Sequence, residues 1–499
     1  MKYTFTNKLT LNAVSSIIQV FFTALLYFFL YRYLLSCIGI ELFGVWSLIL
    51  SFSSIANLAN LGITSGLVKF VAEYITEDDK HELGKLIFTS MFSTTFLFLI
   101  FSTLVFLLSR YFLHYAVDNS YLQISLEIIP FSLLSLSINA VSGVFTSVLE
   151  GFQKNYYRNL IYLLSGIIMF VTTVILAPLY GVKGVALAQL VQSFSILVLA
   201  VILNFYISDY TKPRYWRWSK NTFLELFNYG YKFQLVSVAQ LFYEPTTKIL
   251  LSKFGGLSLL GHYEMATRLV SQFRSLMVNA NQVVVPVIAT NNKVFDQEKK
   301  NIFFSKMNRF VATVTFPLSG LLIVITPLIS LIWIGDVNKD FVFSMVALTI
   351  ATAINIISGP TYFSCLADGR LNILVIVHVL MAILNLLLGY LLIFLFHHYG
   401  TVLGWVASLT IGSMILILIY FQKSNIKFNT VFTKDNIFSL ISIMILGITT
   451  LVLVNSMVLN NNIYIKLLIL VLLYMVLFIP SLIKNKTLVR LINIKIEKK

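Results

Sequence analysis

Apolar residues along this 499-residue chain form long uninterrupted runs rather than short alternating segments. Each run covers about 20 residues, which is the length an α-helix needs to cross roughly 30 Å of hydrocarbon. A membrane barrel would instead show alternating segments of about ten residues. The pattern therefore predicts an all-α polytopic membrane protein.

By this length criterion the chain holds about fourteen spans. We expect the first run to be retained, because it is longer than the apolar region of a cleaved signal. The predicted spans are 12–35, 42–66, 86–110, 121–148, 158–178, 183–206, 223–252, 260–288, 308–334, 341–366, 372–396, 402–421, 436–456 and 463–482.

The overall composition agrees with a membrane protein. Hydrophobic residues make up 58% of the chain and charged residues only 11%, with a mean hydropathy of +0.88. A soluble domain carries about 25% charged residues, so a soluble globular protein is excluded. Cys37 and Cys365 lie in or beside apolar runs, so we expect neither a disulfide framework nor a metal site. No cofactor is expected.

The basic residues predict an orientation. With a cytoplasmic N-terminus, most of the 36 lysines and arginines fall in cytoplasmic segments, including 212–220 and the tail 484–499. This distribution is a positive-inside bias. Both termini are therefore predicted to be cytoplasmic. The net charge of +16 reflects topology and contact with the lipid bilayer, and no nucleic-acid partner is expected.

The chain contains an internal repeat. SGVFTSVLEGFQKN (142–155) aligns with SGPTYFSCLADGRLN (358–372), and FGVWSLILS (43–51) aligns with LGHYEMATR (260–268). GVKGVALAQ at position 181 likewise matches GTVLGWVAS at position 400. The offset of about 216–220 residues corresponds to six spans, and an even number of spans makes the two copies parallel.

This repeat predicts two six-helix lobes followed by a helical hairpin. Transporters built from such repeats bind their substrate between the copies near the bilayer midplane. The predicted parts are an N-lobe (1–210), a cytoplasmic linker (211–221), a C-lobe (222–422), and a last pair of spans with a basic cytoplasmic tail (423–499).

The span GHYEMATRLVSQFRSLMVNANQ (261–282) has a polar face inside the membrane. At about 100° per residue, Glu264, Ser271, Gln272, Ser275, Asn279 and Gln282 lie within about 60° of Arg268. Arg274 extends this face. A charge left in lipid costs at least about 2.5–3.5 kcal/mol, so the face must contact protein or water.

Ionisable residues inside the spans concentrate at the start of the second lobe. The basic ones are Lys232, Lys248, Arg268 and Arg274, and the acidic ones are Glu127, Glu244 and Glu264. Glu264–Arg268 and Glu244–Lys248 are spaced i, i+4 and could neutralise each other. A salt bridge to another helix could explain Arg274.

A cationic interior suits an anionic substrate. The forked donors of arginine match phosphate oxygens, and amides such as Asn279 and Gln282 suit sugar hydroxyls. The residues therefore predict a phosphate-bearing, sugar-rich ligand. Glu127, Glu244 and Glu264 are candidates for binding a coupling ion, with none favoured, so the energy source stays open.

Four segments carry a family resemblance: NLGITSGLVKFVAEY (60–74), VLEGFQKNYYRN (148–159), YEPTTKILLSKFGGLSLLGHYEMATRLVSQFRSL (243–276) and LADGRLN (366–372). They resemble the polysaccharide repeat-unit flippases of the multidrug/oligosaccharidyl-lipid/polysaccharide exporter superfamily. The resemblance implies a MATE-like, fourteen-helix protein of the bacterial inner membrane.

Such a protein would move undecaprenyl-diphosphate-linked oligosaccharides, such as O-antigen or capsule units, to the periplasmic leaflet by alternating access. The resemblance implies that the four basic residues bind the diphosphate. It also implies a polysaccharide polymerase and a chain-length regulator as partners.

Two other functions stay open. An organic-cation exporter of the same superfamily would use acidic residues in its cavity, and Glu127, Glu244 and Glu264 are available. A membrane-embedded polymerase or glycosyltransferase would need a catalytic domain, for which the external loops are too short. A transporter rather than an enzyme is therefore expected.

Overall fold

The computed structural model describes residues 2–77, 79–207, 212–282, 297–426, 428, 432–457 and 463–484. These residues are helical almost throughout and include no strand. They form two compact units, Met1–Gly261 and His262–Lys499, which divide within helix α8.

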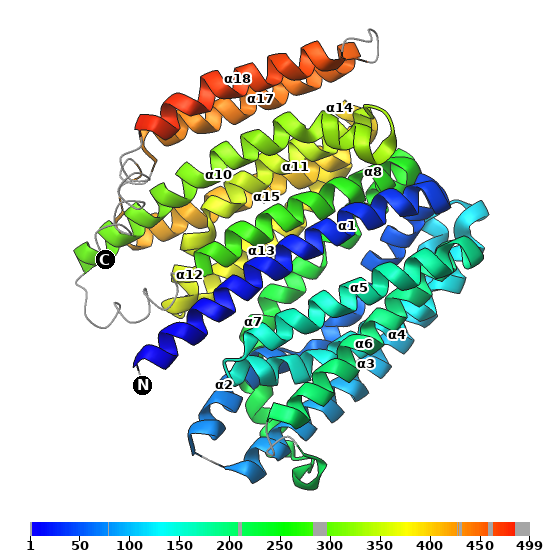
Figure 1. The fold of residues 1–499 in the computed structure, drawn as a ribbon, viewed down its shortest axis with the longest axis vertical. Helices are drawn as coiled ribbons and strands as arrows, with labels where there is room; N and C mark the ends of the chain where they lie inside the picture. The colour runs from blue at the N-terminus through cyan, green and yellow to red at the C-terminus, as the bar shows by residue number, and fades with distance from the viewer. Residues whose placement is uncertain are drawn as a thin grey trace. The chain divides into compact units, whose positions relative to one another are not determined.

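The first unit contains these elements (Figure 1): α1 (Lys2–Ser53), η1 (Ser54–Asn60), α2 (Ile63–Glu77), α3 (Lys80–Ala116), α4 (Asn119–Gly151), α5 (Asn155–Tyr180), α6 (Val182–Ile207), η3 (Pro213–Tyr215), α7 (Lys220–Leu241) and the first part of α8 (Tyr243–Gln282). The second unit holds the rest of α8 and these elements: α10 (Gln297–Ile334), α11 (Lys339–Ile357), α12 (Gly359–Ala367), α13 (Leu371–Leu391), α14 (Ile393–Phe396), η4 (His397–Tyr399), α15 (Gly400–Lys423), α17 (Lys434–Met457) and α18 (Ile463–Lys484).

The helices confirm the predicted fold class. Nine segments of the described residues are long and apolar enough to span a bilayer, and two of them, Val14–Asn60 and Leu371–Lys423, are long enough for two passes each. Each of the fourteen predicted spans falls on helix, although the last residues of span 260–288 lie outside the described part. Large apolar side chains on α3, such as Phe96 and Leu107, are exposed, as a lipid-facing surface requires.

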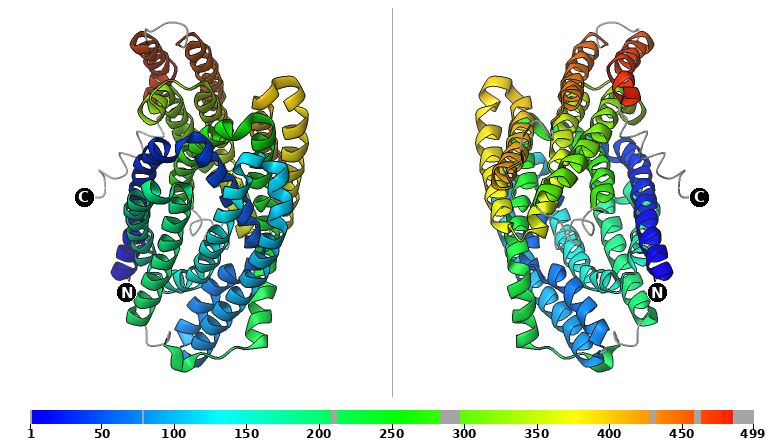
Figure 2. Two further views of the ribbon diagram at one scale, coloured as in Figure 1. Left: turned by 90° about the vertical axis from the view of Figure 1, so that its right-hand side faces the viewer. Right: turned by 90° about the vertical axis from the view of Figure 1, so that its left-hand side faces the viewer.

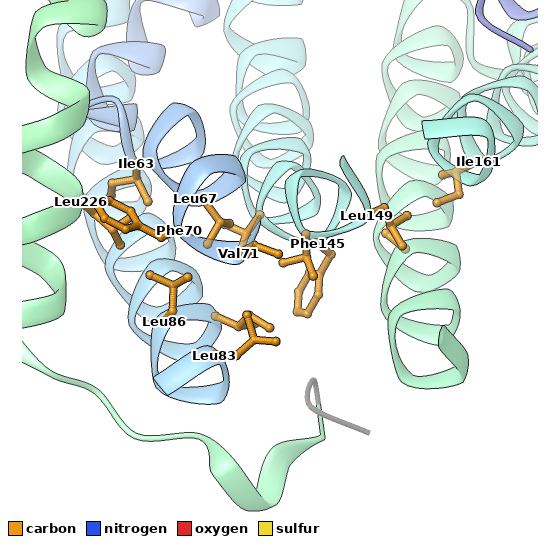
Figure 3. Packing of buried hydrophobic residues seen from close by; sticks show 14 of the residues in the cluster. Ile63, Leu67, Phe70, Val71, Leu83, Leu86, Phe145, Leu149, Ile161 and Leu226 are labelled. Atoms are coloured by element: carbon orange, nitrogen blue, oxygen red, sulfur yellow. The ribbon is translucent and has the colours of Figure 1, made fainter. Parts of the chain in front are cut away.

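In the first unit, α4, α5 and α6 pack on one another, α1 lies against α5, and α3 lies against α4. A buried apolar cluster joins α2, α3 and α4 through Leu67, Leu83 and Phe145 (Figure 3). Leu226 of α7 belongs to the same cluster. The first helix after the linker is therefore part of the core of the first unit.

In the second unit, α13 packs on α15, and α10 packs on α11 and α17. The hairpin of α17 and α18, orange and red in Figure 1 and Figure 2, lies against α10. This is the C-terminal pair of spans predicted from the apolar runs.

The structure contains the predicted repeat. α1 and α8 each break at a glycine, Gly39 (φ 79, ψ 169) and Gly256 (φ 79, ψ 168), at equivalent places 217 residues apart. Glycine adopts this positive φ without the clash that a Cβ would cause. Two interhelical hydrogen bonds also recur. Asn139 Nδ2 donates to Ser193 Oγ between α4 and α6 (2.9 Å), and Asn355 Nδ2 donates to Ser413 Oγ between α11 and α15 (3.0 Å).

The linker is docked on α3. Tyr215 covers Gly84, Trp216 stacks on Phe88 with ring centroids 5.6 Å apart, and Trp218 Nε1 donates to Ser93 Oγ (3.2 Å). Because α7 then packs on η1, α2 and α3, the compact units divide at Gly261 rather than at the linker. The lobe limits at 210 and 222, which follow the repeat, stay a prediction.

Two glycines allow α1 and α8 to cross at very short distance. A Cβ on Gly44 would overlap the carbonyl oxygen of Leu257, and one on Gly261 would lie 2.6 Å from the carbonyl oxygen of Ile40. The two contacts are related by the repeat, since Gly261 lies 217 positions after Gly44 and Leu257 lies 217 positions after Ile40. Small residues at such crossings let helix backbones pack closely in membranes.

We expect Gly44→Ala to destabilise the protein by about 1–3 kcal/mol, because the added methyl meets backbone that cannot rotate away. Thermal unfolding in detergent would measure this loss. Gly143→Ala is the matched control, since its Cβ would lie 3.7 Å from Thr64 Cγ2, an ordinary contact. Equal unfolding temperatures for the two variants would contradict the close crossing.

Candidate functional site

The first unit has a partly open polar cavity of about 360 Å³, lined by η1, α7 and the start of α8. Seven of the eight residues that line it are polar, which is unusual inside a chain this apolar. The lining residues are Ser54, Asn57, Asn60, Gln234, Ser237, Gln240, Leu241 and Glu244.

One wall of the cavity comes from η1. This segment is a 3₁₀-helix, in which three residues make one turn and side chains at i and i+3 eclipse. Ser54, Asn57 and Asn60 therefore form a single row along the cavity. Ala56 and Ala59, also three residues apart, are fully buried on another row. The segment ends where Leu61 (φ 47) and Gly62 (φ 77) take left-handed conformations.

The other wall comes from α7 and the start of α8. Gln234, Ser237, Leu241 and Glu244 follow one another at intervals of three and four residues, which places them on one helical face. Gln234 Nε2 donates to the Asn57 carbonyl oxygen at 3.4 Å and joins the two walls. Gly62 and Gly230 bring the backbones together beside it, since a Cβ on either would overlap the other residue's carbonyl group.

Glu244 and Lys248 form an ion pair at the edge of the cavity. Lys248 Nζ lies 2.5 Å from Glu244 Oε1 and 3.4 Å from the Ser47 carbonyl oxygen. The Lys248 side chain is fully buried, whereas that of Glu244 is 51% exposed. The carboxylate therefore faces the cavity while the ammonium group lies behind it.

The second i, i+4 pair lies in the second unit. Arg268 Nε donates to Glu264 Oε1 at 2.6 Å, the Glu264 side chain is fully buried, and that of Arg268 is 37% exposed. The guanidinium group thus keeps an exposed part while its charge is balanced.

Arg274 has a different environment. Its Nε donates to Asn355 Oδ1 at 2.9 Å, and Asn355 in turn donates to Ser413. Within the described part of the chain, no carboxylate lies at ion-pair distance from Arg274. A salt bridge from Arg274 to another helix, which the sequence left open, is therefore not found among the described residues. By the 217-residue offset, Arg274 occupies the place that Asn57 holds in the first copy.

The remaining predicted site residues are not brought into this cavity. Glu127 Oε2 lies 2.5 Å from Lys183 Nζ, its other oxygen accepts from Gln123 (3.2 Å), and it is not among the residues that line the cavity. Lys232 lies on α7, and Asn279 and Gln282 lie on α8, but their side chains are outside the described part of the structure. In the described residues, no group of three His, Cys, Asp or Glu side chains is placed to hold a metal ion.

Among the polar residues of the cavity, sequence reasoning singled out neither Ser54 nor Gln234, Ser237 and Gln240. Their signal is an interval of three residues between polar side chains on a span that is otherwise apolar. Neutral amides and hydroxyls are a weaker signal than charged residues, because they cost less inside a membrane span.

The fold is that of known membrane transporters. "Lipid II flippase MurJ, inward closed conformation" matches with a TM-score of 0.71 and 16% identity over 95% of this chain and all of that one. An inward-facing multidrug resistance MATE family transporter of the MOP superfamily matches with a TM-score of 0.68 and 13% identity over 82% of this chain and 98% of that one. At these identities the likeness shows the fold alone.

Sequence comparison then gives the family. The family model described as "Polysaccharide biosynthesis protein" matches residues 34–343, and the chain belongs to this family. A Shigella flexneri protein named "Putative O-antigen transporter" is 22% identical over 408 residues, which cover 79% of this chain and 93% of that protein. The resemblance identified in the sequence is thereby confirmed.

Proposed function

We propose that the protein moves undecaprenyl-diphosphate-linked oligosaccharides from the cytoplasmic to the periplasmic leaflet of a bacterial inner membrane. The observation that carries this proposal is the cavity that amides and hydroxyls line in so apolar a chain, because such a lining can form hydrogen bonds with a polar cargo. Membership in the polysaccharide biosynthesis family supports a glycan as that cargo. Cytoplasmic termini, and a polymerase and chain-length regulator as partners, belong to the same proposal.

Arg274 is the strongest candidate for the diphosphate. Its guanidinium group is oriented by Asn355 but its charge is not balanced by a described carboxylate, so a phosphate oxygen can supply the missing anion. Arg268 can offer its exposed side to the same group. Lys248 is fully buried, and we assign it to positioning Glu244. For Lys232, Asn279 and Gln282, substrate contact stays a prediction.

Each acidic candidate for a coupling ion already has a basic partner. Glu127, Glu244 and Glu264 lie within 2.6 Å of Lys183, Lys248 and Arg268 respectively. An incoming cation would have to compete with that partner. Ion coupling through these residues therefore stays a prediction from the sequence.

An organic-cation exporter is the second candidate function, since Glu244 presents a carboxylate to the cavity. Lys248 compensates this charge and weakens the attraction for a cation. Extrusion of fluorescent organic cations by proteoliposomes, unaffected by prenyl-diphosphate glycans, would favour this alternative.

Deletion of the gene tests the proposed function. We expect undecaprenyl-diphosphate-linked oligosaccharide to accumulate on the cytoplasmic side and the surface polysaccharide to be lost. Extraction of lipid-linked glycans, combined with leaflet-specific labelling, measures both effects, and expression of the intact protein should reverse them. Normal delivery of the lipid-linked glycan in the deletion strain would refute the proposal.

A further inference from the structure

The cavity of the first unit is neutral except for one carboxylate. Its lining comprises four amides, two hydroxyls, Leu241 and Glu244. No basic side chain is among these described residues. With no cation and one carboxylate among the lining residues, the cavity does not suit a diphosphate, which binds most strongly to cationic groups. The cavity is therefore suited to an uncharged polar group rather than to a diphosphate.

Amides and hydroxyls match sugar hydroxyls. Four amide side chains line the cavity, Asn57, Asn60, Gln234 and Gln240, and an amide group carries N–H donors and a carbonyl acceptor. Gln234 Nε2 donates to the Asn57 carbonyl oxygen, and the Asn60 amide is bonded to Thr64 Oγ1. A sugar hydroxyl also donates and accepts, so each can be satisfied by such a wall. At about 360 Å³, the cavity is at the small end of ligand pockets. It can hold part of an oligosaccharide rather than a long repeat unit.

Glu244 adds a charged acceptor to this wall. One of its oxygens is held by the buried Lys248 ammonium group, which also contacts the Ser47 carbonyl oxygen. The carboxylate remains half exposed at the cavity. A sugar hydroxyl can donate to it in a charge-assisted hydrogen bond. A carboxylate on the sugar would instead meet a like charge, whereas the ammonium group that could attract it lies behind Glu244.

We propose that this cavity is a glycan subsite that selects uncharged sugars over acidic ones. Glu244 accepts hydroxyl hydrogens from the sugar, and Lys248 is a positioning residue that holds the Glu244 carboxylate in place. The inference rests on the proposed function, because it assumes that a lipid-linked glycan enters the protein.

Binding to the purified full-length protein in nanodiscs tests this inference. Three probes share a short prenyl diphosphate: one has no sugar, one has a neutral disaccharide, and one has the same disaccharide with a single uronic acid. The protein should bind the neutral conjugate at least tenfold more tightly than either other probe. Asn57→Ala and Gln240→Ala should each weaken binding of the neutral conjugate about tenfold and leave the sugar-free probe unchanged.

The role of the ion pair is tested by the double variant Glu244→Gln/Lys248→Met, which removes both charges, so that no buried ammonium group remains. The ratio of neutral to acidic binding should fall at least fivefold toward one. A purely structural role for the pair would not change this ratio. Glu82→Gln and Gln123→Ala are matched controls on the same unit, away from the lining, and should retain the ratio of the unaltered protein.

The outcomes separate the two proposals. If the sugar-free probe binds but the disaccharides add nothing, or if neutral and acidic conjugates bind equally to the unaltered protein, the glycan subsite is wrong and the proposed function stands. An unchanged ratio in the double variant would also overturn the assignment of Glu244. If none of the three probes binds, the proposed function itself fails.

Discussion

Replacing Arg274 with alanine is expected to reduce transport of the lipid-linked glycan by about 100-fold or more, while the protein still reaches the membrane. The reason is that Arg274 offers a charge that no described carboxylate balances, so it can bind a phosphate at full strength. Losing two charge-assisted hydrogen bonds of about 1.5–3 kcal/mol each accounts for an effect of this size. Flipping of a fluorescent lipid-linked glycan in proteoliposomes would measure it.

Two further variants sharpen this prediction. Arg274→Lys keeps the charge but loses the forked donors, and we expect an intermediate rate. Arg110→Ala removes an exposed arginine of α3 and should retain full activity. Transport at the unaltered rate by Arg274→Ala would remove Arg274 from the substrate-binding residues, whatever the behaviour of the lysine variant.

The Glu244–Lys248 pair is expected to give the largest effect on stability, and an unequal one. Glu244→Gln should destabilise the protein by about 3–5 kcal/mol, because it leaves the fully buried Lys248 ammonium group without its counter-charge. Lys248→Met should cost less, since the Glu244 carboxylate is half exposed at the cavity and can be hydrated there. The double variant should recover most of the loss, because no buried charge remains.

Thermal unfolding of the four proteins in the same detergent would measure these differences. The surface pair Glu82 and Lys85, 2.9 Å apart at the start of α3, is the matched control. Exposed pairs of this kind contribute about 0–1 kcal/mol, so Glu82→Gln should have little effect. Equal losses from Glu244→Gln and Lys248→Met would contradict the unequal burial of the two partners.

Much of the fold could be predicted from the sequence, because apolar runs of span length are a direct consequence of the bilayer. The breaks at Gly39 and Gly256 could not, since a helix-compatible run does not show which glycine takes a positive φ. The 3₁₀ winding of η1 was hidden in the same way inside the predicted span 42–66.

The site was predicted in part for a similar reason. The pairs Glu244–Lys248 and Glu264–Arg268 follow from i, i+4 spacing, and the structure contains both. The bond from Arg274 to Asn355 joins residues 81 positions apart, and local spacing carries no information on it. Gln234 and Asn57 likewise meet only because α7 packs against η1.

The winding of η1 has a mechanical consequence for the cavity. Three residues per turn advance about 120° per residue, whereas an α-helix advances about 100°. Over the six steps from Ser54 to Asn60, rewinding η1 into an α-helix would rotate Asn60 by about 120° relative to Ser54. Such a change would turn the Asn60 amide away from the cavity and would shorten the segment by about 3 Å, because the rise per residue falls from about 2.0 Å to about 1.5 Å.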